Sequence, residues 1–353
     1  MRRLIAAVLA GAACTWCAAA VDVVLLRGGE PPLEGEVTLS EAGVTVRTGT
    51  GSDATLEVPW DRVRDVRMLK EPADLDRYLA RAEDLWRARS RLERGDAAMA
   101  EPLFERLFAD YRGRTSETAL VVAEGLLRCR LERHDLSRAV VPALEVARLR
   151  RADVTTASYG ELAVVYDEET GLCVGVPPVW LDEASAQQLA GQLGRYDARG
   201  DAVVAALRRL YLASASPGEA EVEVDRETRR HPGVRLMMDL VETNSRDEGR
   251  RDAARGRLLR DMRRLPDWAE GGARYCVGHS LVQEQDPARA ELGALQLSHL
   301  PARYAQQQPY LAGLALRELI EFAQLGGNVA AAGSLRQEFA RRYAFHPVRR
   351  FVQ

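Results

Sequence analysis

One short segment, Gly278-His279-Ser280-Leu281-Val282, has residue types that could carry out nucleophilic chemistry. It imitates the G-x-S-x-G elbow of serine hydrolases, in which a strand, a sharp turn and a helix expose the serine. Val282 takes the place of the closing glycine, however, and the apolar periodicity around the segment is helical. The sequence therefore favours a helix over a serine nucleophile at this position.

Metal and cofactor chemistry has little support in the sequence. Cys276 and His279 are spaced as neighbours on one helix face, but a zinc site needs at least three protein ligands. No second pair is evident among the other histidines, which are His134, His231, His299 and His346. Lys70 is the only lysine, and no glycine-rich loop surrounds it, so phosphate-loop and Schiff-base chemistry have no candidate. We expect no cofactor and no metal.

The distribution of charge argues against nucleic acid as a partner. The full chain has 52 acidic and 49 basic residues and a formal net charge of -3. The densest basic stretch, residues 246–264, contains eight arginines, but four carboxylates are interleaved with them at helical spacing. We interpret this stretch as a solvated helix face whose charges pair with one another, and we expect no nucleic-acid binding.

The first twenty residues have the three zones of a secretory signal peptide. Arg2 and Arg3 form a basic start, Leu4 to Ala13 an apolar core, and Ala18 to Ala20 a small-residue cleavage site. Cleavage before Val21 would also remove Arg2 and Arg3 and make the chain more acidic. The apolar core is shorter than the roughly 20 residues of a membrane-spanning helix. We therefore expect an exported protein, periplasmic or associated with the cell envelope, without a transmembrane span.

The cysteines leave one alternative open. A lipid anchor at Cys14 could replace simple cleavage, although Gly-Ala-Ala precedes it instead of a leucine three residues back. Cys14 and Cys17 resemble a redox pair, but both lie in the segment expected to be removed. The remaining cysteines are Cys129, Cys173 and Cys276. They permit at most one disulfide, and we expect each to be a buried free thiol.

Residues 21–69 alternate apolar and polar positions between turn signals, which predicts a small β-domain. The expected strands are Val23 to Leu26, Leu33 to Leu39, Val44 to Val46, Leu56 to Trp60 and Val63 to Val66. Five short strands must curl to cover one face, and the segment resembles the small five-stranded barrels of the Sm-like or Src-homology type. Its most distinctive piece is Pro59-Trp60-Asp61-Arg62-Val63, in which we interpret Trp60 as a lid on the core.

The apolar period changes from two to about 3.6 residues after Glu71-Pro72, which predicts helices in residues 70–152. The expected hairpins pair Ala82–Arg94 with Asp96–Tyr111, and Thr115–Arg133 with Asp135–Arg150.

The two hairpins share a short internal repeat. Leu92-Glu93-Arg94-Gly95-Asp96 recurs 39 positions later as Leu131-Glu132-Arg133-His134-Asp135, and Ala100 is matched by Ala139. In each copy we expect the aspartate to cap the second helix and the alanine to let the helices approach closely.

The hairpins resemble tetratricopeptide repeats. The positions that match the family's small and bulky residues are Ala88, Ala100 and Phe104, and less completely Leu127, Ala139 and Ala143. The spacing of 39 exceeds the family's period of roughly 34 residues. The resemblance implies a mainly α protein, in which antiparallel helical hairpins stack as a tetratricopeptide-like solenoid after the β-barrel.

A second helical region, residues 183–353, is tetratricopeptide-like from about residue 273. The expected helices are Ala273–Gln285, Asp286–Leu300, Pro309–Leu325 and Asn328–Tyr343. Asp286 as a cap and Pro287 at the first helical position are the clearest boundary signals. The pattern leaves open whether the two regions form one continuous stack.

Residues 153–182 interrupt the helices. Asp167 to Gly171 and Pro177-Pro178 predict an extended or hairpin-like insertion. Its apolar residues Tyr166, Cys173 and Trp180 could line a partner groove, or the insertion could cover the end of a helical stack.

Two functions from different classes remain. The first is a non-catalytic scaffold or adaptor that binds a protein or peptide partner in the bacterial cell envelope. The second is an envelope hydrolase that acts on cell-wall material through a site assembled from residues distant in sequence. We favour the scaffold, because repeat helices explain most of the chain. The candidate partner-binding residues are Tyr166, Trp180, Arg87, Arg91, Arg128 and Arg317.

Overall fold

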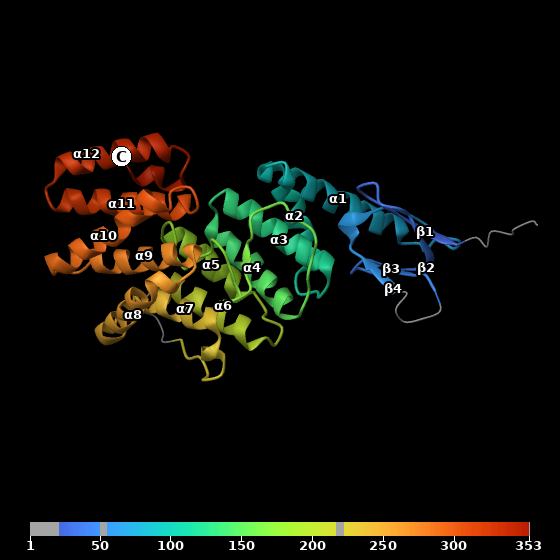
Figure 1. Ribbon diagram of the computed structural model, residues 1–353, viewed down its shortest axis with the longest axis horizontal. Coiled ribbons are helices and arrows are strands. Elements are labelled where there is room, and N and C mark those ends of the chain that lie inside the picture. The colour runs from blue at the N-terminus through green and yellow to red at the C-terminus, as the bar shows by residue number, and fades with distance from the viewer. Residues whose placement is uncertain (1–20, 50–54, 217–221, 353) are drawn as a thin grey trace, which may run out of the picture.

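The computed structural model describes residues 21–49, 55–216 and 222–352. The expected signal peptide, residues 1–20, lies outside these stretches and stays a prediction. The described fold is mainly helical, with a small antiparallel sheet at one end and the C-terminal helices at the other (Figure 1). In these stretches, no helix combines the length and the apolar character that crossing a membrane would require.

The sheet has five strands close to the positions that the alternation predicts. They are β1 (Asp22–Leu26), β2 (Leu33–Leu39), β3 (Val44–Arg47), β4 (Thr55–Val58) and β5 (Val63–Arg67). Neighbouring strands run antiparallel in the order β4-β3-β2-β1-β5. Because β4 and β5 form the two edges, the sheet is open, and the predicted closure into a barrel is wrong.

Helix α1 (Leu75–Glu93) covers the apolar face of the sheet, which a closed barrel would have buried. It packs on β5 and on the 3₁₀ turn Trp60–Arg62, which follows β4. Trp60 is fully buried there and stacks on Tyr78 of α1, with ring centroids 5.2 Å apart. Its backbone N–H donates to the Thr118 hydroxyl at 3.1 Å, and its indole N–H to the Ser40 carbonyl at 2.9 Å. Trp60 is therefore a core lid, as predicted, and it also joins the sheet to the helices.

Consecutive helices pack against one another along the whole chain. After α1 they are α2 (Ala97–Tyr111), α3 (Glu117–Glu132), α4 (Leu136–Arg151), α5 (Glu183–Gly194), α6 (Ala202–Ala215), α7 (Pro232–Glu242), α8 (Glu248–Asp261), α9 (Asp267–Val282), α10 (Pro287–Arg303), α11 (Pro309–Leu325) and α12 (Val329–Arg342). Helix α1 begins seven positions before its predicted start, because Leu75 and Tyr78 are buried against the sheet.

The two copies of the internal repeat, which are 39 positions apart, form equivalent turns between helices. Asp96 accepts a hydrogen bond from the N–H of Met99, and Asp135 accepts one from the N–H of Arg138, so both predicted caps are confirmed. Ala100 and Ala139 are fully buried at the two helix contacts. Each turn needs a left-handed residue, which is Gly95 in the first copy (φ 78°) and His134 in the second (φ 57°).

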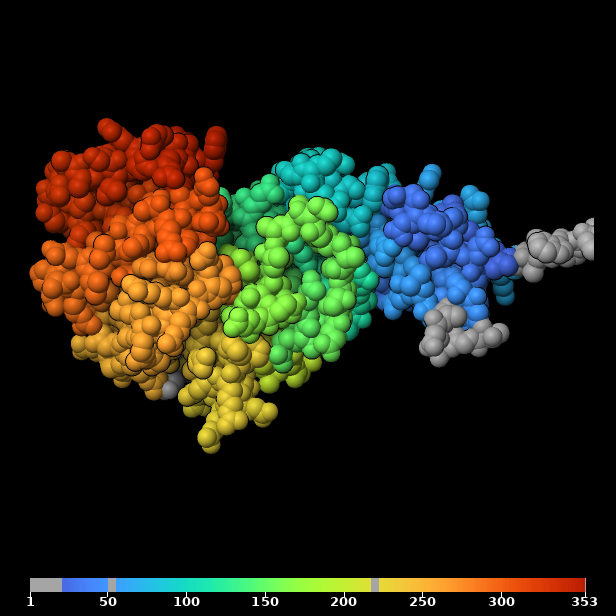
Figure 2. Space-filling model, in the orientation of Figure 1, coloured from blue at the N-terminus to red at the C-terminus, as the bar shows by residue number. Residues whose placement is uncertain are grey.

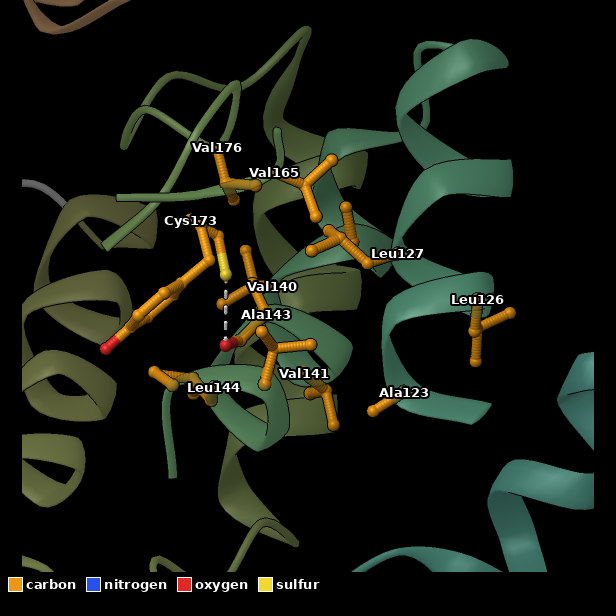
Figure 3. Close-up of a cluster of buried hydrophobic side chains, with 14 of the residues drawn as sticks. Ala123, Leu126, Leu127, Val140, Val141, Ala143, Leu144, Val165, Cys173 and Val176 are labelled. Atoms are coloured by element: carbon orange, nitrogen blue, oxygen red, sulfur yellow. Dashed lines mark hydrogen bonds between the residues drawn. The ribbon is translucent and has the colours of Figure 1, made fainter. Parts of the chain in front are cut away.

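The insertion between α4 and α5 packs against α3 and α4 (Figure 3). It contains a two-stranded antiparallel hairpin, β6 (Tyr166–Asp167) and β7 (Leu172–Cys173). Figure 3 shows its apolar side chains against α3 and α4, where the Cys173 thiol donates to the Ala143 carbonyl at 3.4 Å. Cys129, Cys173 and Cys276 are buried and free, which confirms the expected state of the three thiols.

The C-terminal helices also touch the insertion and the first helical region. Arg350 forms an ion pair with Asp182 at the end of the insertion, and Arg317 of α11 donates to the Leu181 carbonyl at 3.3 Å. The imidazole of His346 stacks on that of His134, with ring centroids 5.7 Å apart. These contacts hold the second half of the chain against the first.

Candidate functional site

Two pockets of the described structure are lined in part by residues of α9. Trp268, Gly272, Cys276 and His279 recur at intervals of three or four residues, so they lie along one stripe of the helix. Pro177 of the insertion packs at Gly272 in the middle of this stripe, 3.5 Å from the position that a glycine Cβ would occupy. The insertion therefore separates a pocket near His279 from a pocket near Trp268.

The pocket near His279, called the Trp180 pocket here, has a volume of about 320 Å³. Its lining comes from the end of the insertion, from α5, α6, α9 and α11, and from the loop after α7. The lining residues are Pro178, Val179, Trp180, Asp182, Glu183, Ala186, Ser214, Ala215, Asn244, Tyr275, Cys276, His279, Arg317 and Glu318. The Trp180 indole N–H donates to the Ser214 hydroxyl at 3.2 Å, which fixes this aromatic wall. The volume suits one or two side chains of a partner.

The polar end of the Trp180 pocket is an internally neutralised cluster. Glu318 accepts hydrogen bonds from Arg317 at 3.0 Å and from the Tyr275 hydroxyl at 3.4 Å. The Nδ1 atom of His279 lies 3.2 Å from the same carboxylate, and its ring stacks on Tyr275. Burial alone would raise the pKa of Glu318, but His279 and Arg317 outweigh it and hold that pKa below its usual value. Glu318 is therefore a carboxylate whose charge is satisfied within the fold.

The two candidate nucleophiles near His279 have other roles. Burial raises the pKa of Cys276 to about 12, so its thiol stays protonated at neutral pH. The Ser280 hydroxyl donates to the Thr243 carbonyl and accepts from the Arg255 guanidinium at 2.6 and 3.0 Å. Ser280 lies inside α9, as the helical periodicity predicted, and ties this helix to α7 and α8.

One arginine of residues 246–264, the stretch predicted to be a solvated helix face, is buried. Arg255 of α8 is only 3% exposed and forms ion pairs with Asp252 and with Glu284, the latter at 2.7 Å. It also donates to the Ser280 carbonyl at 2.8 Å. The prediction of a solvated face was wrong for this position, because Ser280 of α9 and Glu284, just after α9, supply partners that make burial of a guanidinium tolerable.

The pocket near Trp268, called the Trp268 pocket here, has a volume of about 610 Å³. It lies between the hairpin of the insertion, the first turn of α9 and the start of α11, and Figure 2 shows the insertion on this face of the molecule beside the C-terminal helices. Its lining residues are Val164, Tyr166, Asp167, Glu168, Glu169, Val174, Gly175, Asp267, Trp268, Gln307 and Gln308. Gln308 donates to the carbonyls of Asp267 and Trp268 at 2.9 and 3.1 Å, which joins α11 to α9 at this pocket.

Neither pocket offers a recognisable metal centre. Among the residues that the structure describes, no group of three or more His, Cys, Asp or Glu side chains could hold a metal ion. Cys276 and His279 share the α9 stripe but acquire no third ligand there.

Comparison of the chain with protein-family models, with curated proteins and with solved structures finds no match. The function must therefore be inferred from the two pockets themselves.

The structure distributes the predicted partner-binding residues over separate places. Trp180 and Arg317 line the Trp180 pocket, whereas Tyr166 lines the Trp268 pocket. Arg128 is engaged within the fold, because it pairs with Glu124 at 2.6 Å and donates to the Ala163 carbonyl of the insertion. The two remaining arginines are on α1, beside the sheet (Figure 1): Arg87 pairs with Glu83, and Arg91 donates to the Met99 carbonyl.

Three residues that matter at the pockets were missed as binding candidates. Trp268 and Tyr275 lie seven positions apart on α9, a helical spacing that could have placed them on one face. Glu318 had no such signal, because it is 39 positions from His279 and reaches the pocket only through the packing of α11 on α9.

Proposed function

We propose that this chain is an exported, non-catalytic scaffold or adaptor that binds a protein or peptide partner in the bacterial cell envelope. The observation that carries the proposal is the Trp180 pocket, which is lined by the aromatic rings of Trp180 and Tyr275 and in which the charge of Glu318 is already satisfied by Arg317. Pockets of this kind accept one apolar or aromatic anchor residue of a partner, and such anchors dominate the energy of many interfaces. The signal peptide predicted over residues 1–20 supports export.

A tetratricopeptide-like stack of hairpins is part of the same proposal. Supporting observations are the packing of each helix on the next and the repeated turns at Gly95 and His134. In such a stack the helices form a rigid frame, and the insertion supplies the irregular backbone at which binding residues commonly occur.

Filling the Trp180 pocket tests this function. Ala215→Leu should occupy the space without removing a hydrogen bond, and Trp180→Ala should remove an aromatic wall. We expect each variant to lower recovery of the partner, captured from the envelope of the source cell, by about tenfold, equivalent to about 1.4 kcal/mol. Ala213→Leu adds the same side chain to the same helix outside the pocket lining and should leave recovery unchanged. Equal recovery with all four proteins would contradict binding at this pocket.

The His279–Glu318 pair favours hydrolysis as the second candidate function, because a carboxylate beside an imidazole can orient a general base. If the chain is an envelope hydrolase, the wild-type protein should release soluble fragments from purified cell-wall material. His279→Asn should abolish that release while leaving the unfolding temperature nearly unchanged. No release by the wild-type protein is the result that the scaffold proposal requires.

A further inference from the structure

The Trp268 pocket combines an apolar interior with an acidic rim. Tyr166 and Val174 come from the hairpin of the insertion, Trp268 comes from α9, and Val164 stands 72% exposed at the edge. Asp167, Glu168, Glu169 and Asp267 line the same pocket, and none of its lining residues is Lys, Arg or His.

These four carboxylates differ from most acidic groups of the described structure, because none of them forms an ion pair there. Asp167 accepts hydrogen bonds from the Thr170 backbone and hydroxyl, while Glu168, Glu169 and Asp267 are exposed to solvent. The arginines beside the hairpin form ion pairs with other carboxylates: Arg128 and Arg150 pair with Glu124 at 2.6 and 3.4 Å, and Arg151 pairs with Asp201 at 2.8 Å.

The spread of the carboxylates limits the kind of cation that fits. No three of them converge on a point where a metal ion could be held. A ligand that pairs with several of them needs separate positive charges, and it must also cover the apolar interior. Arginine and lysine meet both requirements, because their aliphatic stems pack on apolar and aromatic surfaces while the charged group reaches a carboxylate.

We propose that the Trp268 pocket binds a basic, partly apolar peptide segment, which places arginine or lysine at Glu168, Glu169 and Asp267 and apolar side chains against Val164 and Trp268. This inference rests on the proposed binding function and names the partner chemistry of its second pocket. Pro177 separates the two pockets, so each can be altered without touching the other.

Binding of defined peptides to the full chain tests the inference. The probe is a fluorescent nonapeptide of alternating arginine and leucine, and its comparison peptides alternate glutamate with leucine and arginine with glycine. We expect the Arg/Leu peptide to bind most tightly, and its affinity should fall as salt is added, because exposed charges are screened. The triple variant Glu168→Gln, Glu169→Gln, Asp267→Asn should weaken this binding by about tenfold or more.

A matched control removes the same number of charges elsewhere. Glu57, Asp76 and Glu291 are exposed and lie outside the pocket, so Glu57→Gln, Asp76→Asn, Glu291→Gln changes the net charge equally. This control should bind the Arg/Leu peptide like the wild-type protein, and Val164→Ser should weaken binding about threefold through lost apolar contact.

Three results would overturn the inference. Equal losses in the pocket and control triple variants would mean that only net charge matters. Tight binding of spermine, reduced to the same degree by the pocket variant, would identify a general polyamine site. Unchanged peptide affinity in the pocket variant would remove this pocket as the binding place. If Ala215→Leu still lost the native partner in that last case, the proposed function would stand while this inference failed.

Discussion

Replacing Trp60 with alanine is expected to lower the free energy of unfolding by about 3–5 kcal/mol, the range for deletion of a large aromatic ring from a core. Trp60 is fully buried, stacks on Tyr78 and donates its indole N–H to the Ser40 carbonyl. The substitution removes the ring contact between sheet and α1, and it leaves a cavity together with an unpaired carbonyl. Urea unfolding followed by circular dichroism measures the loss.

Trp86 provides the matched control, because it lies on the same α1 helix but is only half-buried, with the Arg27 guanidinium 4.4 Å from its ring centroid. Trp86→Ala should cost about 1 kcal/mol, the size of a partly exposed cation–π contact with its packing. A Trp60→Ala loss no larger than that of Trp86→Ala would mean that the sheet does not depend on this joint.

Acidification from about pH 6.5 to about pH 4 is expected to remove about 3 kcal/mol of stability through His346 alone, at 1.36 kcal/mol per pKa unit. Burial lowers the pKa of His346 to about 4, and the neighbouring His134 contributes in the same direction, against a hydrogen bond to Tyr310 that opposes them. Above the unfolded value of about 6.5 both states are neutral, so the full stability is present. As the pH falls below about 6.5, His346 takes up a proton in the unfolded chain but not in the folded one. The contribution of His346 to the stability is therefore lost by about pH 4.

The geometry explains why the folded state excludes the proton. Nε2 of His346 donates to the Tyr310 carbonyl at 2.9 Å, and Nδ1 accepts from the Val348 N–H at 3.0 Å, so protonation of Nδ1 would place two donors face to face. His346→Gln should flatten the pH dependence of unfolding between these limits, even if its stability at neutral pH is lower. Parallel curves for His346→Gln and the wild-type protein would show that another group carries the effect.

Local patterns predicted the parts of this fold that local chemistry determines. The strands appeared where apolar residues alternate, and Asp96, Asp135 and Asp286 cap helices because a carboxylate can accept free N–H groups in any context. The open sheet could not be predicted in the same way. Helix α1 covers the core of the sheet through long-range contacts such as that of Trp60 with Tyr78, and strand periodicity carries no information about such contacts.

The two pockets were less predictable, because each is assembled from segments far apart in the sequence. Trp180 and Arg317 were listed as separate candidates, and nothing in their sequence neighbourhoods indicates that α11 lies beside the insertion and brings both into one pocket. The sequence of α8 looks like a solvated charged face, and only the position of Glu284 on the neighbouring helix hairpin makes Arg255 a buried anchor.

Photo-crosslinking from the rim of the Trp180 pocket tests the proposed binding function most directly. Glu183 lines the pocket and is exposed, whereas Gly191 is on the same helix, α5, and has open space around it. A benzoylphenylalanine introduced at each position, in the source cell, should yield a specific adduct with an envelope protein from Glu183, and that adduct should disappear with Ala215→Leu. The same adducts from both positions, or none from Glu183, would contradict a partner bound in this pocket.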